Sequence, residues 1–108
     1  MDAILGCTGF QWDESNTEKS WLRHKVTWTE CEEAFFNHPF LLLVDEKHSG
    51  AEPRYYALGK THAARGLFVA FTVRGDLIRV VSARDMSRRE RKEYAHAEQE
   101  SAQEDSEV

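Results

Sequence analysis

Apolar and polar positions in the first part of the chain follow a helical period. Asp13 is placed as an N-cap, and helical spacing continues from it to Lys25, which predicts a first helix. Thr27 and Glu30 have the spacing of a capping box, in which each side chain hydrogen-bonds the other residue's backbone N–H, and they predict the start of a second helix. Pro39 ends that helix, because a proline disfavours the helical conformation of the residue before it.

Strand-like patterns follow in the middle of the chain. Residues 67–73 are apolar at nearly every position, which predicts a central strand with both faces covered. Arg74-Gly75-Asp76 is short enough to join this strand to the next one in an antiparallel hairpin. A second capping box, formed by Ser87 and Glu90, places the start of a last helix at or just after Ser87. The four predicted strands are 40–44, 54–59, 67–73 and 77–83.

This order of elements predicts the fold class. It gives an α+β fold with two N-terminal helices on one face of a four-stranded antiparallel sheet, followed by a basic C-terminal helix. The length of 108 residues suits a single domain. Residues 95–108 are polar and acidic and contain no core-forming side chains. We therefore assign the domain to residues 1–94 and expect the remainder to be an acidic, solvated or disordered tail.

Charge is distributed unevenly along the chain. The net charge is −5, but residues 1–46 hold three basic and nine acidic side chains, and residues 95–108 hold five acidic side chains and no Lys or Arg. Residues 47–94 hold eleven basic and five acidic side chains, a net charge of +6. An acidic protein can therefore still have a basic surface that attracts an anionic partner, because the local field decides the encounter.

Composition excludes several classes of protein. The apolar and charged fractions, 41% and 31%, are typical of soluble globular proteins. The longest apolar run is far shorter than the roughly 20 residues of a membrane span, and the N-terminus lacks the basic and apolar regions of a signal peptide. We therefore expect a cytoplasmic protein with no membrane partner. The five histidines and two cysteines do not have the spacing of a metal site, and we expect no bound metal or other cofactor.

The predicted last helix begins with a concentration of positive charge. Arg88, Arg89 and Arg91 lie in its first turn, where the helix dipole favours negative side chains. We interpret this unfavourable placement as a sign of an anionic partner, and Arg79 and Arg84 extend the positive charge back into the preceding strand. The ordinary alternative is a solvated helix face on which neighbouring glutamates pair with the arginines.

The same cations suit the cleavage of RNA. When the nucleophile is the 2′-hydroxyl of the RNA itself, the protein needs to supply a proton acceptor, a proton donor and cations that stabilise the phosphorane. Histidine is a common proton-transfer residue, and Arg54 and Arg84 come from neighbouring predicted strands, so His24, Arg54 and Arg84 are the candidate catalytic residues. The alternatives are an ordinary helix C-terminal cation for His24 and a structural ion pair for Arg54. The candidates for RNA binding are Arg23, Arg79, Arg88 and Arg89.

Several short motifs together resemble a known family. The chain is similar to BrnT-type toxins over about residues 10–94, and the combination of motifs is much more specific than any one of them. The residues that carry the resemblance are Phe10-x-Trp12-Asp13, Arg23-His24-x-Val26, Glu32-Glu33-Ala34-x-Phe36, Pro39, His48, Glu52-x-Arg54, Leu58-Gly59, Thr72-x-Arg74, Val80-Val81-Ser82-Ala83-Arg84 and Arg88-Arg89-Glu90-Arg91-x-x-Tyr94.

The resemblance implies a fold, an activity and a partner. BrnT-type toxins look like RelE-type ribonucleases, which are compact and metal-independent, and the resemblance implies an endoribonuclease that cleaves mRNA and inhibits translation. It also implies that a BrnA-like antitoxin, a ribbon-helix-helix DNA-binding protein, holds the toxin inactive. By the same resemblance, the substrate is RNA and the protein contacts operator DNA only through the antitoxin.

Three positions differ from the usual family pattern. Ser20 stands where asparagine is usual, Arg23 stands for a lysine and Lys25 for a glycine. Lys25 would have to accept a backbone conformation that glycine adopts more easily. These differences favour an alternative function, a catalytically inactive toxin-like binding module that acts as partner or corepressor of a DNA-binding antitoxin. A plain RNA-binding domain, recognised by salt-sensitive affinity without cleavage, is a third hypothesis.

Overall fold

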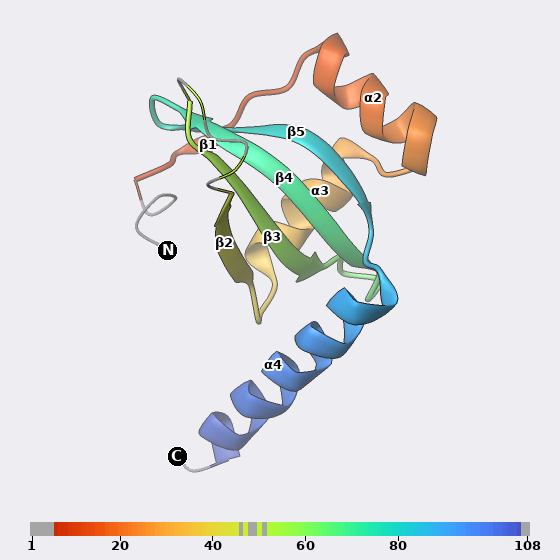
Figure 1. Cartoon of the computed structure of the whole chain (residues 1–108), viewed down its shortest axis with the longest axis vertical. Helices are drawn as coiled ribbons and strands as arrows, with labels where there is room; N and C mark the ends of the chain where they lie inside the picture. Colours follow the sequence, from red (N-terminus) through yellow and green to blue (C-terminus); the bar gives the residue numbers. More distant parts are fainter. Residues whose placement is uncertain (1–5, 46, 48–49, 51, 107–108) are drawn as a thin grey trace.

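The computed structural model describes residues 6–45, 47, 50 and 52–106 (Figure 1). His48 lies outside the described residues, as do the side chains of residues 19–22, 45 and 103–106. The elements in chain order are β1 (Gly9–Phe10), α2 (Glu14–His24), α3 (Trp28–Phe36), β2 (Leu41–Asp45), β3 (Arg54–Lys60), β4 (Gly66–Arg74), β5 (Leu77–Asp85) and α4 (Arg88–Ser106).

The sheet has five strands and is mixed, whereas the sequence predicted four antiparallel strands. The strand order is β1-β5-β4-β3-β2, so the apolar strand β4 is central, as predicted. The strands β2 to β5 pair in antiparallel fashion, but β1 pairs with β5 in parallel. The two residues of β1 are too few to show an alternating pattern, and hydrogen bonds to the distant residues Asp76 and Ile78 hold the segment in place.

Local capping explains where the helices begin. Asp13 accepts a hydrogen bond from the backbone N–H of Ser15 at 3.0 Å, as expected of the N-cap of α2. The predicted capping box of Thr27 and Glu30 is present, with the two reciprocal bonds at 3.1 and 3.0 Å. The box of Ser87 and Glu90, predicted in the same way, is also present at the start of α4. These three helix starts are confirmed.

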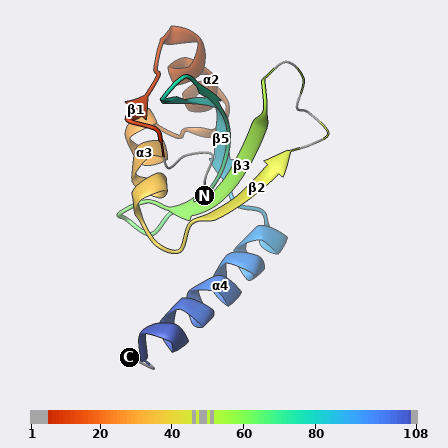
Figure 2. The same ribbon diagram turned by 90° about the vertical axis from the view of Figure 1, so that its left-hand side faces the viewer.

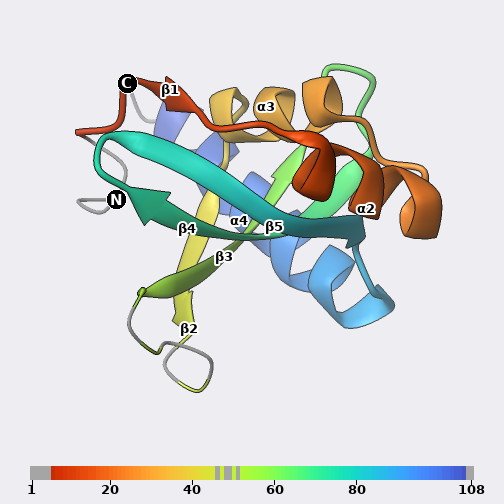
Figure 3. The ribbon, with the colours of Figure 1, turned by 90° about the horizontal axis from the view of Figure 1, so that it is seen from above.

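The main core lies between the sheet and the helices α2 and α3, which occupy the same side of the sheet (Figures 2 and 3). From the central strand β4, Leu67, Val69 and Phe71 point into this core and are fully buried. On the opposite face of β4, Phe68 and Ala70 remain partly exposed. The prediction that both faces of this strand would be covered is therefore confirmed for the core face and only partly for the other, where Thr72 is buried but Phe68 and Ala70 are not.

The helix α4 packs on the lower end of the sheet and then projects away from it (Figure 1). A second, small apolar cluster of Leu58, Met86 and Tyr94 anchors its first half. The segment that we expected to be a solvated or disordered tail is helical as far as Ser106, because residues 95–106 contain alanine, glutamate and glutamine but no glycine or proline. The domain boundary at residue 94 stays a prediction. Among the described residues, no helix is long and apolar enough to cross a membrane.

Candidate functional site

Three of the predicted arginines lie on the sheet face opposite α3, which we call the open face. In the register of the sheet, Arg54 pairs with Thr72 and Thr72 pairs with Arg79. Phe68, which lies four residues before Thr72 on β4, pairs with Arg84. Side chains that are directly opposite one another on paired strands point to the same face. The fold therefore gathers on one face three arginines that are remote from one another in sequence.

A β-bulge is required for Arg79 and Arg84 to share this face. The two residues are five apart on β5, and an odd separation in a regular strand would place them on opposite faces. The register shifts beside Ala70, which pairs with Ser82, whereas Phe71 pairs with Val80. Val81 is therefore the extra, unpaired residue of a bulge. Without this extra residue, the side chain of Arg84 would lie on the core face of the sheet.

Arg54 and Arg79 line one cavity of about 170 Å³ on the open face. Arg79 is held there by Asp13, with 2.9 Å between its Nη1 and the carboxylate, and its side chain is only 14% exposed. Arg74, also in the lining, pairs with Glu52 at 3.0 Å. Hydrogen bonds from Arg79 lower the pKa of Asp13, and those from Arg74 lower the pKa of Glu52. The cavity is therefore a cationic site with ionised carboxylates at its edge.

Arg84 lies at the other end of the open face, against α4. Its Nη1 and Nη2 donate to the two carboxylate oxygens of Glu90 at 2.8 and 3.0 Å. The guanidinium also stacks on Phe68, with its carbon 4.0 Å from the ring centroid. Hydrogen bonds from Arg84 hold the pKa of Glu90 below its usual value, so this carboxylate is ionised at neutral pH. Glu90 thus both caps α4 and fixes the orientation of Arg84.

The two cationic sites are too far apart to grip a single phosphate. Arg54 is opposite Thr72 and Arg84 is opposite Phe68, so their rows are four residues apart on β4. Four residues of strand span about 13 Å, at about 3.3 Å per residue. The structure therefore brings Arg54 together with Arg79, but it separates both from Arg84. An RNA strand across the open face would meet these sites at different phosphates.

His24 lies away from both cationic sites. It is exposed at the C-terminal end of α2 and lines neither open-face cavity. Hydrogen bonds from Arg65 are the main cause of the lowered pKa of Asp85, and a smaller electrostatic contribution comes from His24. His24 is therefore at the end of β5, beside the residue that follows Arg84 in sequence.

The other predicted RNA-binding residues are on the surface. Arg23 is exposed at the end of α2, and Arg88 is exposed at the start of α4. Arg89 is 90% exposed and makes a loose ion pair with Glu93, at 3.5 Å. Such exposed pairs stabilise a helix little, so these side chains can be redirected by an anionic ligand at small energetic cost.

Sequence analysis missed Arg65, which is the most connected side chain described. Its guanidinium donates to Asp85 at 2.7 Å, to Glu30 at 3.1 Å, and to the backbone carbonyls of His24 and Lys25. These contacts tie the C-terminal end of α2, the start of α3 and the end of β5 together. Its partners are 20 to 41 residues away in the sequence, and Arg65 lies in a polar connector that offers no local signal.

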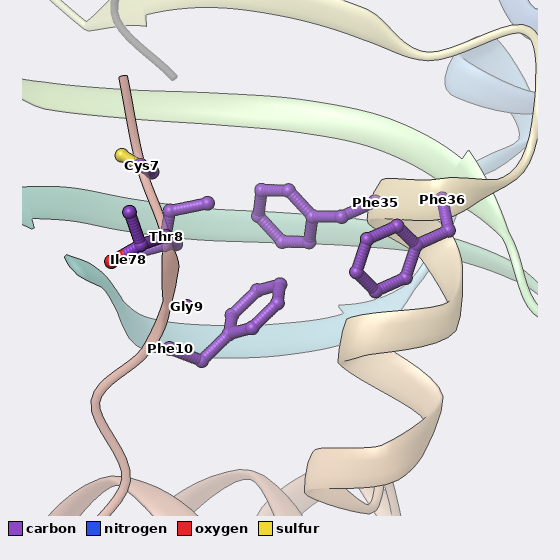
Figure 4. A pocket seen from close by; sticks show the side chains of 7 residues that line it. All are labelled: Cys7, Thr8, Gly9, Phe10, Phe35, Phe36 and Ile78. Carbon is purple, nitrogen blue, oxygen red and sulfur yellow. The ribbon is translucent and has the colours of Figure 1, made fainter. Parts of the chain in front are cut away.

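An apolar cavity of about 210 Å³ lies between β1 and the C-terminal end of α3. Figure 4 shows Phe10, Phe35 and Phe36 facing one another in it, with Cys7 at its margin. Burial raises the pKa of the Cys7 thiol, and the nearby negative charge of Asp76 raises it further. The lining carries no charged side chain, so this cavity does not suit a phosphate.

Among the described residues, Cys31 and the potential metal ligands do not form a nucleophilic or metal site. Burial raises the pKa of Cys31 to about 12, so its thiol stays protonated and is a poor nucleophile. In the part of the chain that the structure describes, no three His, Cys, Asp or Glu side chains are grouped so as to hold a metal ion.

One comparison with known proteins places the chain in a family. Residues 12–90 match the family model described as ribonuclease toxin, BrnT, of type II toxin–antitoxin system. No match was found among curated individual proteins. The matched region covers most of the chain and includes the arginines of the open face and the start of α4. The chain therefore belongs to the BrnT family of ribonuclease toxins, so its partner is an antitoxin and its substrate is RNA.

Proposed function

We propose that this toxin is a metal-independent endoribonuclease that cleaves mRNA bound on the open face and thereby inhibits translation. The observation that carries the proposal is the gathering of Arg54, Arg79 and Arg84 on one sheet face, with Tyr56 and Phe68 between them. A guanidinium group can hold two phosphate oxygens at once, and aromatic rings on a sheet can stack with bases. This face therefore combines the two kinds of group that a single RNA strand needs.

The proposed reaction uses the 2′-hydroxyl of the RNA as nucleophile. A general base removes its proton, the oxygen attacks the adjacent phosphorus, and the 5′-oxygen of the next nucleotide leaves with a proton from a general acid. Arg84 stabilises the charge on the phosphorane, and Arg54 and Arg79 hold a phosphate farther along the strand. His24 is the candidate for proton transfer, which requires the RNA to pass the end of β5, where His24 lies beside Asp85.

The proposed partner is a BrnA-like ribbon-helix-helix antitoxin in the cytoplasm. The antitoxin would inhibit the toxin by covering the open face and the basic start of α4, where Arg88 and Arg89 are exposed. Operator DNA would be bound by the antitoxin alone. This fits the distribution of charge along the chain, because residues 47–94, which include the open-face arginines and the start of α4, carry a net charge of +6.

Cleavage of a mixed mRNA sample in the presence of EDTA tests this function. The wild-type protein should cleave RNA under these conditions. Arg84→Ala should lower the cleavage rate about a hundredfold or more, the usual effect of removing one group that stabilises a developing negative charge. Lys92→Ala is the matched control, because it removes an exposed cation from α4 and should cleave as fast as the wild type. Cleavage by Arg84→Ala at the wild-type rate would remove Arg84 from the mechanism.

One observation favours the second function, a catalytically inactive module that binds the antitoxin. Lys25, where the family usually has glycine, adopts a left-handed conformation with φ of 55°, directly after His24. Lysine in place of glycine adds a long, charged side chain directly beside the proposed proton-transfer residue, and this side chain would hinder catalysis there. Expression of the toxin without antitoxin separates the two functions, since only the nuclease should arrest growth.

A further inference from the structure

A cavity of about 210 Å³ lies between the open face and the first turns of α4. Its floor is formed by side chains of three adjacent strands: Leu43 of β2, Tyr56 and Leu58 of β3, and Phe68 of β4. Its rim is formed by polar side chains of α4 that include Arg89 and Glu93. The cavity therefore has an aromatic and aliphatic floor and a charged rim that carries both hydrogen-bond donors and acceptors.

The two aromatic rings in the floor contact each other in a tilted arrangement. The ring centroids of Tyr56 and Phe68 are 5.3 Å apart, with 33° between the planes. Both side chains are only partly buried, and Leu43 beside them is exposed. Partly exposed aromatic side chains on a sheet are the usual platform for the bases of single-stranded RNA, because every base has a flat π face.

The cavity is directly connected to the proposed phosphate-binding residue. The guanidinium of Arg84 stacks on Phe68 and pairs with Glu90, and both of these residues line the cavity. A base that enters the cavity would therefore place its own sugar and phosphate next to Arg84. A cation beside an aromatic platform is the arrangement that proteins use to follow the backbone of a single strand while they stack its bases.

We propose that this cavity binds one unpaired nucleobase of single-stranded RNA, next to the phosphate held by Arg84. The base packs against Tyr56, and Arg89 and Glu93 hydrogen-bond its polar edge and set the base preference. The proposal deepens the function proposed above and rests on it. The bases of a duplex are stacked on one another and cannot enter such a cavity, so the substrate class is single-stranded RNA.

Abasic nucleotides test the proposal. A short, labelled single-stranded RNA is prepared with each nucleotide in turn replaced by an abasic one, and its dissociation constant is measured by fluorescence anisotropy alongside its cleavage rate. With the wild type, one abasic position should weaken binding about 5- to 150-fold, the range expected for losing one base–aromatic stack. In Tyr56→Leu, the abasic nucleotide at this position should weaken binding no more than it does at other positions. In Tyr56→Phe, it should weaken binding as it does in the wild type.

Two further measurements keep the result unambiguous. Circular dichroism and thermal melting verify that Tyr56→Leu is folded. Because Arg89 is 90% exposed, Arg89→Ala is expected to fold normally, and it should reduce the difference in affinity among the four bases at the position identified by the abasic series. Equal abasic penalties in the wild type and in Tyr56→Leu would overturn the proposal, and so would an Arg89→Ala protein with unchanged base preference.

The design also separates this proposal from the proposed nuclease function. A wild type that binds RNA with the predicted abasic pattern but cleaves none of it would refute the nuclease function and leave the base site standing. Conversely, cleavage that depends on Arg84, with no position-specific abasic penalty, would leave the nuclease standing and overturn the base site. Loss of antitoxin binding by Tyr56→Leu, together with unchanged abasic penalties, would assign the cavity to the antitoxin and also overturn the proposal.

Discussion

Replacement of Arg65 by alanine should destabilise the protein more than replacement of an ordinary surface arginine. The Arg65 guanidinium bonds the carboxylates of Glu30 and Asp85 and the backbone carbonyls of His24 and Lys25. It therefore joins the end of α2, the start of α3 and the end of β5. Alanine removes all of these contacts at once.

The magnitude follows from the burial of the partners. The side chains of Arg65 and Glu30 are 29% and 26% exposed, so water screens their pairing only in part, whereas Asp85 is 59% exposed and contributes less. Hydrogen bonds to charged groups contribute about 1.5–3 kcal/mol each, and the truncation also leaves Glu30 without its cation. We expect the free energy of unfolding to fall by about 2–4 kcal/mol, and Tm to fall by roughly 8–20 °C.

The effect should depend on pH in a defined direction. Hydrogen bonds from Arg65 lower the pKa of Asp85 below its ordinary value of 3.8. Burial raises the pKa of Glu30, but hydrogen bonds from Thr27 and Arg65 outweigh it and leave this pKa below 4.5. Groups with a lowered folded pKa stabilise the protein above their unfolded pKa, and the contribution disappears as the pH falls through the folded value. The difference between wild type and variant should therefore be constant near neutrality and shrink below about pH 4.

Urea unfolding at 25 °C, followed by circular dichroism at several pH values, measures this difference. Arg74→Ala is the matched control, because Arg74 also pairs with a glutamate, but both side chains are about half exposed. Its loss should change the free energy of unfolding much less than the loss of Arg65, because water screens an exposed ion pair. The reasoning would be refuted by an Arg65→Ala protein whose stability at neutral pH is within about 0.5 kcal/mol of that of Arg74→Ala.

Two further predictions concern the packing of α3 and the role of the tail. Gly59→Ala should lower the free energy of unfolding, measured in urea, by about 1–3 kcal/mol. The reason is that a Cβ at Gly59 would lie 2.5 Å from the carbonyl oxygen of Ala34 and force α3 off the sheet. An unchanged urea midpoint would show that α3 shifts freely. Deletion of residues 95–108 should lower the free energy of unfolding by less than about 1 kcal/mol, because the interaction it removes is the partly exposed Lys60–Glu98 ion pair. A larger loss of stability in thermal melting would place the domain boundary beyond residue 94.

Local chemistry explains which parts of the fold were predictable. The capping boxes of Thr27 with Glu30 and of Ser87 with Glu90 need only residues three apart, and both are present where they were predicted. The four main strands were recognised from their apolar runs, to within two residues at each end. The extension of α4 to Ser106 was not predicted, because the polar composition of residues 95–106 indicated a tail, whereas their alanines and glutamates have high helix propensity.

The candidate site was only partly predictable, for a different reason. The residue types pointed to a cationic surface, but the sequence could not show that Arg84 shares a face with Arg79. That depends on the bulge at Val81, which comes from the pairing of β4 with β5. Nor could it show that Glu90, predicted as a cap, would also bind Arg84, or that about 13 Å would separate Arg84 from Arg54.

The sequence by itself determined the starts of the helices, the main strands, the central place of β4 and membership of the BrnT family, since each of these is carried by neighbouring residues or by motif order. Only the tertiary structure decided that β1 joins the sheet, that Arg65 links three elements, and which arginines share a face. The physical reason is that β1 and Arg65 contact residues 20 to 68 positions away, and that the face of each arginine depends on the register of β4 against β5. Strand register and packing select these partners, and local propensity does not.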